Sequence, residues 1–268
     1  DDIGPFTFNA VRFFVGFLAI LPLAFLFETK KFRTEFQLDI KTFVILSTLI
    51  GISLFLGSAL QQVALLHTDV ANAAFFTIFY VPMVPIIVFL FKKKTIHWSV
   101  WPSVVLCLIG GYLLTNFYDA TVRLGDGLVL LGALFWSTHI IFTGMIVSKF
   151  NLPLTIGALQ TFIVAALSFI IGSIYEEFVL DNILKEIDSI LYAGILSGGF
   201  AFVLQIYAQR NIAPAPAAII FSLEGVFATI AAWFLLNQIL DINNILGCCF
   251  ILCGVLLSQL LPLMKKTI

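Results

Sequence analysis

Runs of apolar residues, each roughly as long as a bilayer is thick, recur along the whole chain. Because lipid offers no hydrogen-bond partners to the backbone, we expect each run to be a transmembrane α-helix. The chain is 11% charged, whereas a soluble domain carries about 25% charged residues. The sequence therefore predicts an all-α integral membrane protein with nine spans, at residues 6–27, 41–62, 71–91, 98–115, 127–147, 152–173, 189–209, 215–236 and 243–262.

The basic residues between the spans indicate which side of the membrane each loop faces. With a cytoplasmic C-terminus, only Arg123 and Lys185 fall in outer loops, and Arg12 lies within a span. The other eleven of the 14 basic residues fall in inner loops: Lys30, Lys31, Arg33, Lys41, Lys92, Lys93, Lys94, Lys149, Arg210, Lys265 and Lys266. This bias obeys the positive-inside rule in every loop, so we expect the C-terminus to be cytoplasmic.

The chain also contains an internal repeat. Residues 60–113 and 204–257 align without a gap at an offset of 144 residues, which pairs Ala73 with Ala217 and Gly110 with Gly254. A second offset, of 148 residues, aligns earlier spans and pairs Pro5 with Pro153, Thr7 with Thr155 and Glu28 with Glu176. An internal repeat in so apolar a chain is typical of secondary transporters, whose sites lie where the repeats meet.

The span at 127–147 has no counterpart in the first half, and the chain opens with Asp1-Asp2 rather than the basic segment of a signal peptide. We therefore expect two repeats of five helices, with residues 1–119 lacking the first helix and residues 120–268 complete. An odd number of spans in each copy would place the copies in opposite orientations. Such inverted-topology repeats favour a shared site near mid-membrane and alternating access to it.

Several stretches carry a family resemblance. They are Pro5 with Arg12-Phe13 at the start of a span, Gly125-Asp126-Gly127 before Ala133-Leu134-Phe135-Trp136, residues 217–228, and Gly247 with Gly254-Val255. In order and spacing they resemble the EamA-type transporters of the drug/metabolite transporter superfamily, which are built from two five-helix repeats. This chain departs from the family at Asn237-Gln238, where members often carry Glu, and at Gly225, where many carry Pro. The resemblance implies export of amino acids or related metabolites across a bacterial inner membrane.

Two formal charges fall inside the spans, and such charges usually face a cavity or a partner. Glu224 lies nine residues into its span, a depth of about 14 Å in a helix. It is either a proton-coupling or cation-binding carboxylate, or a protonated group hydrogen-bonded to a neighbouring helix. Arg12 lies nearer the outer surface and is either a contact for a substrate anion or a structural anchor.

Other polar and aromatic residues at similar depth complete a candidate substrate site. Tyr80 is the repeat partner of Glu224, and the nearby Pro82 and Pro85 predict a kink that could serve as a hinge. The candidate substrate-binding residues are Tyr80, Trp136, His139, Thr143, Gln160, Gln205 and Glu224. We expect one central cavity that contains Trp136, His139, Gln160, Glu224 and Tyr80, although ordinary helix packing would account for most of these residues as well.

Other classes of function find less support in the sequence. The four cysteines, which form no Cys-x-x-Cys motif, are Cys107, Cys248, Cys249 and Cys253. We find no cluster of metal ligands, no catalytic constellation and no Gly-rich phosphate loop. We expect no cofactor and no nucleic acid, and a protein that works in the lipid bilayer on a small solute, with protons as a further partner if Glu224 couples to them. A monomer and a homodimer both stay open. The alternatives to a transporter are a facilitator, a channel-like pore or a membrane-embedded enzyme.

Overall fold

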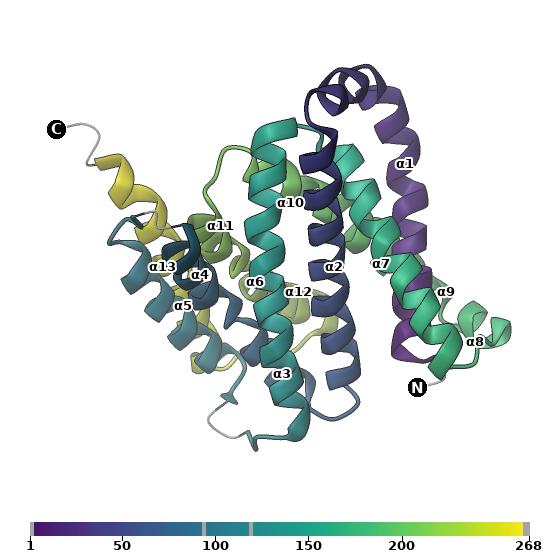
Figure 1. Cartoon of the computed structure of the whole chain (residues 1–268). Helices are drawn as coiled ribbons and strands as arrows, with labels where there is room; N and C mark the ends of the chain where they lie inside the picture. Colours follow the sequence, from purple (N-terminus) through teal and green to yellow (C-terminus); the bar gives the residue numbers. More distant parts are fainter. Residues whose placement is uncertain (1–2, 93–94, 118–119, 265–268) are drawn as a thin grey trace. The chain divides into compact units, whose positions relative to one another are not determined.

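The computed structural model describes residues 3–92, 95–117 and 120–264 (Figure 1). Within these residues every regular element is helical, which confirms the all-α membrane prediction. Eight helical segments are long and apolar enough to cross a membrane, and a ninth, Val100–Leu114, is apolar but has 15 residues. These segments coincide with the nine predicted spans. The predictions for Asp1, Asp2, Lys93, Lys94, Lys265 and Lys266 lie outside the described residues.

Six spans are single helices: α1 (Pro5–Leu38), α2 (Ile40–Ala64), α5 (Val100–Leu114), α6 (Leu124–Phe150), α7 (Pro153–Tyr175) and α13 (Ile242–Met264). The other three consist of consecutive pieces: α3 (Val70–Thr77) with α4 (Tyr80–Lys92); α9 (Ile187–Leu191), the π-helical η2 (Tyr192–Ala201) and α10 (Phe202–Gln209); and α11 (Pro214–Phe221) with α12 (Leu223–Leu236). The short α8 (Leu180–Lys185) precedes α9. Helix α1 continues well past the predicted end of its span, because lysine and arginine are good helix formers.

The chain divides into two compact units, which are described separately. Unit 1 comprises Asp1–Gln62 and Ile141–Ile212, and unit 2 comprises Val63–Ile140 and Ala213–Ile268. Two of the boundaries fall inside α2 and α6, so each unit takes helices from both halves of the sequence. A compact unit and a sequence repeat are different properties of a chain, and the division into repeats at residues 119 and 120 stays a prediction.

Helices α1 and α7 of unit 1 lie side by side and run in opposite directions (Figure 1). Glu176, just after the end of α7, accepts a hydrogen bond from the backbone N–H of Thr7 at the start of α1. Glu28, which lies in α1, accepts a hydrogen bond from the backbone N–H of Thr155 at the start of α7. The offset of 148 residues pairs Thr7 with Thr155 and Glu28 with Glu176. The start of each helix therefore makes the same kind of contact with a glutamate near the end of the other.

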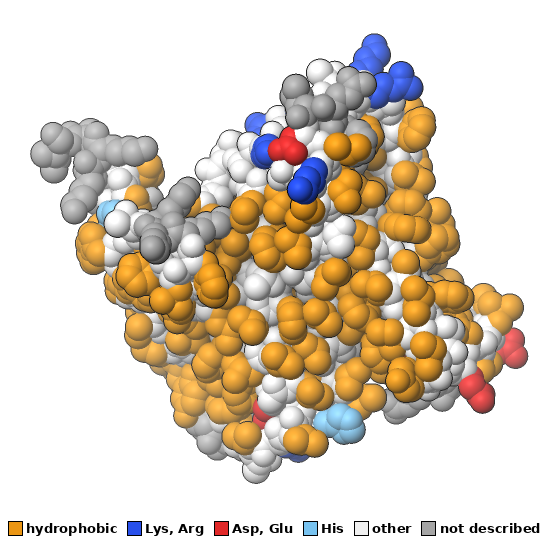
Figure 2. Space-filling model, in the orientation of Figure 1, with side chains coloured by type: hydrophobic (Ala, Val, Ile, Leu, Met, Phe, Trp, Pro, Cys, Tyr) orange, Lys and Arg blue, Asp and Glu red, His pale blue; other side chains and the backbone are white. Residues whose placement is uncertain are grey.

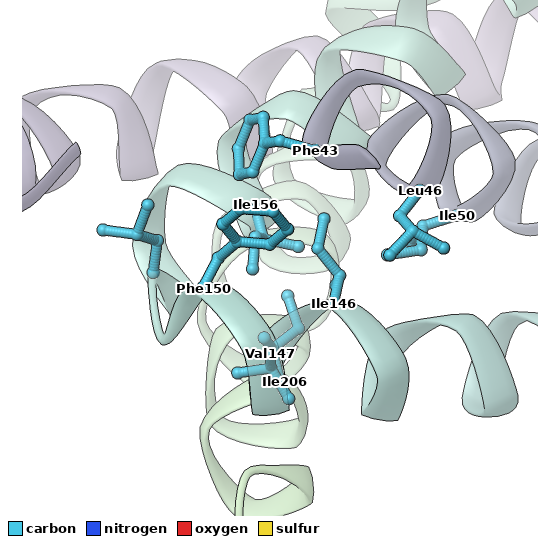
Figure 3. Packing of buried hydrophobic residues seen from close by; sticks show 9 residues of the cluster. Phe43, Leu46, Ile50, Ile146, Val147, Phe150, Ile156 and Ile206 are labelled. Carbon is cyan, nitrogen blue, oxygen red and sulfur yellow. The ribbon is translucent and has the colours of Figure 1, made fainter. Parts of the chain in front are cut away.

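A cluster of buried apolar side chains joins α2, α6 and α10 of unit 1 to α7 (Figure 3). The rings of Phe43 in α2 and Phe150 in α6 meet edge to face, with centroids 5.1 Å apart. The remaining members come from α2, α6, α7, α10 and the turn between α6 and α7: Leu46, Ile50, Ile146, Val147, Leu152, Ile156 and Ile206. This packing fixes the end of α6 and the start of α7 against α2 and α10.

Polar contacts hold the same turn. Asn151 has a φ of 40°, the left-handed conformation common at helix ends. Lys31 Nζ donates to the Asn151 carbonyl oxygen at 2.8 Å, and Arg210 Nη1 donates to the Asn151 side-chain oxygen at 3.1 Å. Nearby, a hydrogen bond from Lys149 is the largest cause that lowers the pKa of Asp39 to about 2. Figure 2 shows Lys and Arg side chains near the turn between α1 and α2, while hydrophobic side chains cover the flanks of the helices.

Helices α5 and α13 of unit 2 approach each other backbone to backbone. A Cβ atom added to Gly110 would lie 2.7 Å from the Gly247 carbonyl oxygen, and one added to Gly247 would lie 2.7 Å from the Gly110 carbonyl oxygen. A Cβ atom on Gly254 would lie 2.9 Å from the Ser103 carbonyl oxygen. Small residues at such contacts are how membrane helices pack closely without a hydrophobic driving force.

One span of unit 2 is broken between α3 and α4. Ile78 N–H donates to Phe75 O at 3.2 Å and Phe79 N–H to Phe76 O at 3.3 Å, each three residues back instead of four. Pro82 explains the position, because it has no N–H to donate to the Ile78 carbonyl four residues before it. The break therefore lies one turn before Pro82, and α4 continues through Pro85. The use of Pro82 and Pro85 as a hinge stays a prediction.

The span aligned with it by the 144-residue offset is broken at the matching position, between α11 and α12. Here Ser222 N–H donates to Ile219 O at 3.3 Å, again three residues back. No proline follows, and Val226 occupies the position that corresponds to Pro82. Instead the Ser222 hydroxyl donates to Ile219 O at 2.6 Å, a type of bond that bends helices. The same type of bond occurs inside the unbroken α2 and α13, from Ser58 to Phe55 O and from Ser258 to Val255 O, so the Ser222 bond accompanies the break without explaining it.

We expect Gly110→Ala to destabilise the protein, because its new methyl group would meet Ile251 Cγ1 at 2.6 Å and the Gly247 backbone at 2.7 Å. Overpacking of this kind costs about 1–3 kcal/mol. Thermal unfolding in one detergent measures the loss. Gly127→Ala is the control, since nothing lies within 4 Å of a Cβ atom there. Equal melting temperatures for the two variants would contradict the close α5–α13 contact.

We expect Pro82→Ala to repair the break between α3 and α4, because it supplies the missing N–H. A proline inside a helix costs about 3 kcal/mol, so amide exchange over residues 78–83, measured by mass spectrometry, should slow and the melting temperature should rise. Pro214→Ala is the matched control, because Pro214 occupies the first position of α11, where no helical bond needs its N–H. Similar responses of the two variants would show that Pro82 does not cause the break.

Candidate functional site

The predicted site residues are divided between the two compact units. Unit 2 contains Tyr80, Trp136, His139 and Glu224. Unit 1 contains the others: Arg12, Thr143, Gln160 and Gln205. A single central cavity that joins both sets stays a prediction, and the geometry below concerns each unit alone.

The two helix breaks of unit 2 bring the start of α4 and the start of α12 to matching places in the repeat. Tyr80 is the first residue of α4, and Glu224 is the second residue of α12. Tyr80 is buried, Glu224 is exposed, and the two are near enough to interact electrostatically. The positive end of a helix dipole lies at its N-terminus, so the first turn of α12 favours the negative charge of a carboxylate.

Cys107 of α5 lies at the same break. Its sulfur is 3.4 Å from the Ser222 hydroxyl oxygen, and both residues are buried. The other three cysteines lie on α13, where Cys249 and Cys253 are exposed and Cys248 is half-buried. Sequence reasoning could not separate Cys107 from them, because its position beside Ser222 depends on how α5 packs against α11.

The unit 2 part of α6 carries the aromatic residues of the predicted site. The rings of Trp136 and His139 meet edge to face with centroids 6.1 Å apart, and His139 is wholly buried. Between them Ser137 donates to the Ala133 carbonyl and lies 3.4 Å from the backbone oxygen of Tyr80. This contact places the Trp136–His139 stripe beside the start of α4. Three predicted site residues therefore lie in one region of unit 2.

Arg12 in unit 1 is held by its own helix. Its Nε donates to Asn9 Oδ1 at 2.9 Å, and its guanidinium carbon lies 5.3 Å and 4.9 Å from the ring centroids of Phe8 and Phe13. Cation–π contacts of this kind stabilise a cation away from water. They support the reading of Arg12 as a structural anchor. Elsewhere in unit 1, Gln160 and Thr143 are buried and Gln205 is half-buried.

A buried acid that sequence reasoning passed over lies at the start of α6. Asp126 is 2% exposed. It accepts hydrogen bonds from the Arg123 backbone N–H at 2.7 Å, from Asn72 Nδ2 at 3.1 Å and from the Thr68 hydroxyl. The bond to Arg123 is the backward reach of a capping box. The Gly-Asp-Gly motif drew attention to this position, but two partners of Asp126 are distant in sequence: Thr68 in the loop before α3 and Asn72 in α3.

Two further features bear on the site. A cavity of about 470 Å³ opens at the turn between α12 and α13, and none of the predicted site residues lines it: its walls are Trp233, Asn237, Gln238, Ile239, Leu240 and Ile245. Over residues 3–92, 95–117 and 120–264, no three His, Cys, Asp or Glu side chains gather in a way that could hold a metal ion.

Known proteins resemble this chain over nearly its whole length. The model of the EamA-like transporter family matches residues 1–116 and 123–260. A protein of Archaeoglobus fulgidus described as an uncharacterized transporter is 31% identical, over 97% of this chain and 78% of its own. The uncharacterized transporter YoaV of Bacillus subtilis is 23% identical, over 96% of this chain and 88% of its own. One solved crystal structure shares the fold, with a TM-score of 0.80 at 15% identity over 98% of this chain and 90% of that one. The resemblance found in the sequence is thus confirmed, and the chain belongs to the EamA-like transporter family of multi-pass membrane proteins.

Proposed function

We propose that this protein is a secondary transporter that exports a small organic solute, such as an amino acid or a related metabolite, by alternating access. The observation that carries the proposal is the pair of matching helix breaks in unit 2, with Tyr80 and Glu224 at the starts of the second halves. Discontinuous helices of this kind form substrate and ion sites in secondary transporters, because their free ends supply backbone groups in the middle of the membrane.

The side chains around these breaks favour a solute with a positively charged or hydrogen-bonding group. Glu224 offers one carboxylate, and Tyr80, Trp136 and His139 offer rings that can stack on an organic solute or bond to it. A phosphorylated solute would need several cations, and Arg12 already contacts Asn9 and two phenylalanine rings. An amino acid, another zwitterion or an organic cation fits better. A contribution of Gln160 and Gln205 to the same site stays a prediction from the sequence.

Glu224 is also the proposed coupling residue. A carboxyl group that exchanges its proton for a cationic solute can use a proton gradient to drive accumulation, since proton and solute compete for one charge. The distribution of basic residues supports a cytoplasmic C-terminus for this arrangement. A facilitator that lacks such coupling is the second candidate. A channel-like pore would need rings of like charge or a carbonyl filter, and a membrane enzyme would need grouped catalytic side chains.

The first step of the test finds a solute. Purified protein is screened by thermal shift against amino acids and organic cations, and the compound with the largest shift is used for transport. A ligand that binds only the folded protein raises the melting temperature, and the rise grows with the ratio of ligand concentration to Kd. A solute that shifts the parent but shifts Glu224→Gln much less would place the carboxylate in the binding site.

Transport is then measured in vesicles across about pH 5.5–8.5, the range in which a coupling carboxyl must exchange protons. We expect accumulation in the parent to depend on pH, and Glu224→Gln, which cannot ionise, to lose accumulation while it still exchanges solute. Glu177→Gln is the control, because Glu177 is exposed and lies outside the spans. If the parent and Glu224→Gln share one pH profile, coupling through Glu224 is wrong and the facilitator is the better description.

A further inference from the structure

Carboxylates close both ends of the α1–α7 pair in unit 1. At one end Glu176 accepts hydrogen bonds from Phe6 N at 2.9 Å, Thr7 N at 2.7 Å and Thr7 Oγ1 at 2.7 Å. At the other end Glu28 accepts the equivalent three from Leu154 N at 3.0 Å, Thr155 N at 2.8 Å and Thr155 Oγ1 at 2.8 Å. We call these two sets of contacts the Glu176 clasp and the Glu28 clasp.

Each clasp satisfies backbone groups that nothing inside the helix can satisfy. The first N–H groups of a helix have no partner within it, and a carboxylate at that end is favoured by the helix dipole. Bonds to an ionised acceptor are also about twice as strong as neutral ones. Glu28 is 6% exposed, so water competes little for its bonds, whereas Glu176 is half-buried. Both clasps are therefore strong compared with ordinary contacts between helices.

The clasps lie a full membrane thickness apart. From Pro5 to Glu28 is 23 residues, as is the step from Pro153 to Glu176, which is about 35 Å at 1.5 Å per residue. The helices also touch between the clasps. The rings of Phe17 and Phe162 have centroids 5.2 Å apart. The pair is thus joined at both ends and in the middle.

We infer that α1 and α7 move as one rigid body during transport, with Glu28 and Glu176 as positioning residues that keep both ends closed in every state. The inference rests on the alternating access proposed above. In that cycle, contacts that gate the two faces of the membrane must open in turn. The clasps are equivalent under the repeat and are closed together, and opening either one would also pull against the packed middle of the pair. The moving gates therefore lie elsewhere.

Hydrogen exchange tests the clasps without any transport assay. In protein reconstituted into lipid nanodiscs, peptides that cover residues 4–9 and 153–158 should both stay protected, with and without the solute chosen by thermal shift and at each pH. Glu176→Ala should speed exchange at Phe6 and Thr7 at least tenfold, given the worth of about 1.5 kcal/mol or more of a hydrogen bond to a charged group. It should leave residues 153–158 unchanged, and Glu177→Ala should change neither end. Protection that moves from one end to the other as solute or pH changes would overturn the inference.

Covalent linking tests whether the pair must open during transport. Cysteines replace Thr7 and Glu176, or Glu28 and Thr155, in a protein whose four native cysteines are alanine, and a short thiol cross-linker joins each pair. Uptake after linking one end or both should stay within about twofold of uptake before linking, because a rigid pair loses no motion. Loss of most uptake on linking would overturn the inference. Absence of uptake in the parent itself would count against the proposed function, while the exchange experiment still decides the clasps.

Discussion

A backbone N–H or C=O group inside lipid has no water to bond, and this constraint governs the structure. It makes every span a helix, and it makes each helix end or break a place where some other group must take over. At the starts of α1 and α7 the substitutes are Glu176 and Glu28. At the start of α6 the substitute is Asp126, which also accepts hydrogen bonds from Asn72 and Thr68 of another segment. These three acidic side chains lie where the starts of helices need hydrogen-bond acceptors.

The same constraint separates the two kinds of helix contact. Where backbones touch, as between α5 and α13, glycines allow the close approach and van der Waals packing stabilises the contact. Where helix ends meet, charged hydrogen bonds tie one element to another. Unit 1 relies mainly on the second kind for α1 and α7, and unit 2 on the first kind for α5 and α13. Each unit therefore contains one antiparallel pair whose members the sequence repeat relates to each other.

The sequence predicted the spans because their length and composition are local properties, and the structure and the family comparison confirm the helical membrane fold. It did not predict where helices bend. Pro82 predicted a kink, whereas the backbone bonding changes one turn earlier, at Ile78 and Phe79, and nothing in the sequence sets Ser222 apart from other serines. The pairing of Glu28 with Glu176 was visible as a repeat position. The contacts that these two residues make could not be predicted, because that requires knowing that α1 and α7 are antiparallel neighbours. Depth could be read for Glu224 and Tyr80, but depth alone does not say which residues share a cavity.

The two breaks of unit 2 differ in permanence. The break before Pro82 is fixed by the covalent structure of proline, since no rearrangement can give it an N–H. The break at Ser222 contains no proline, so every residue there keeps its N–H, and the Ser222 hydroxyl that bonds to Ile219 O can rotate to another acceptor. One of the two aligned breaks is thus imposed by covalent structure, whereas the other depends on hydrogen bonds that a substitution can rearrange.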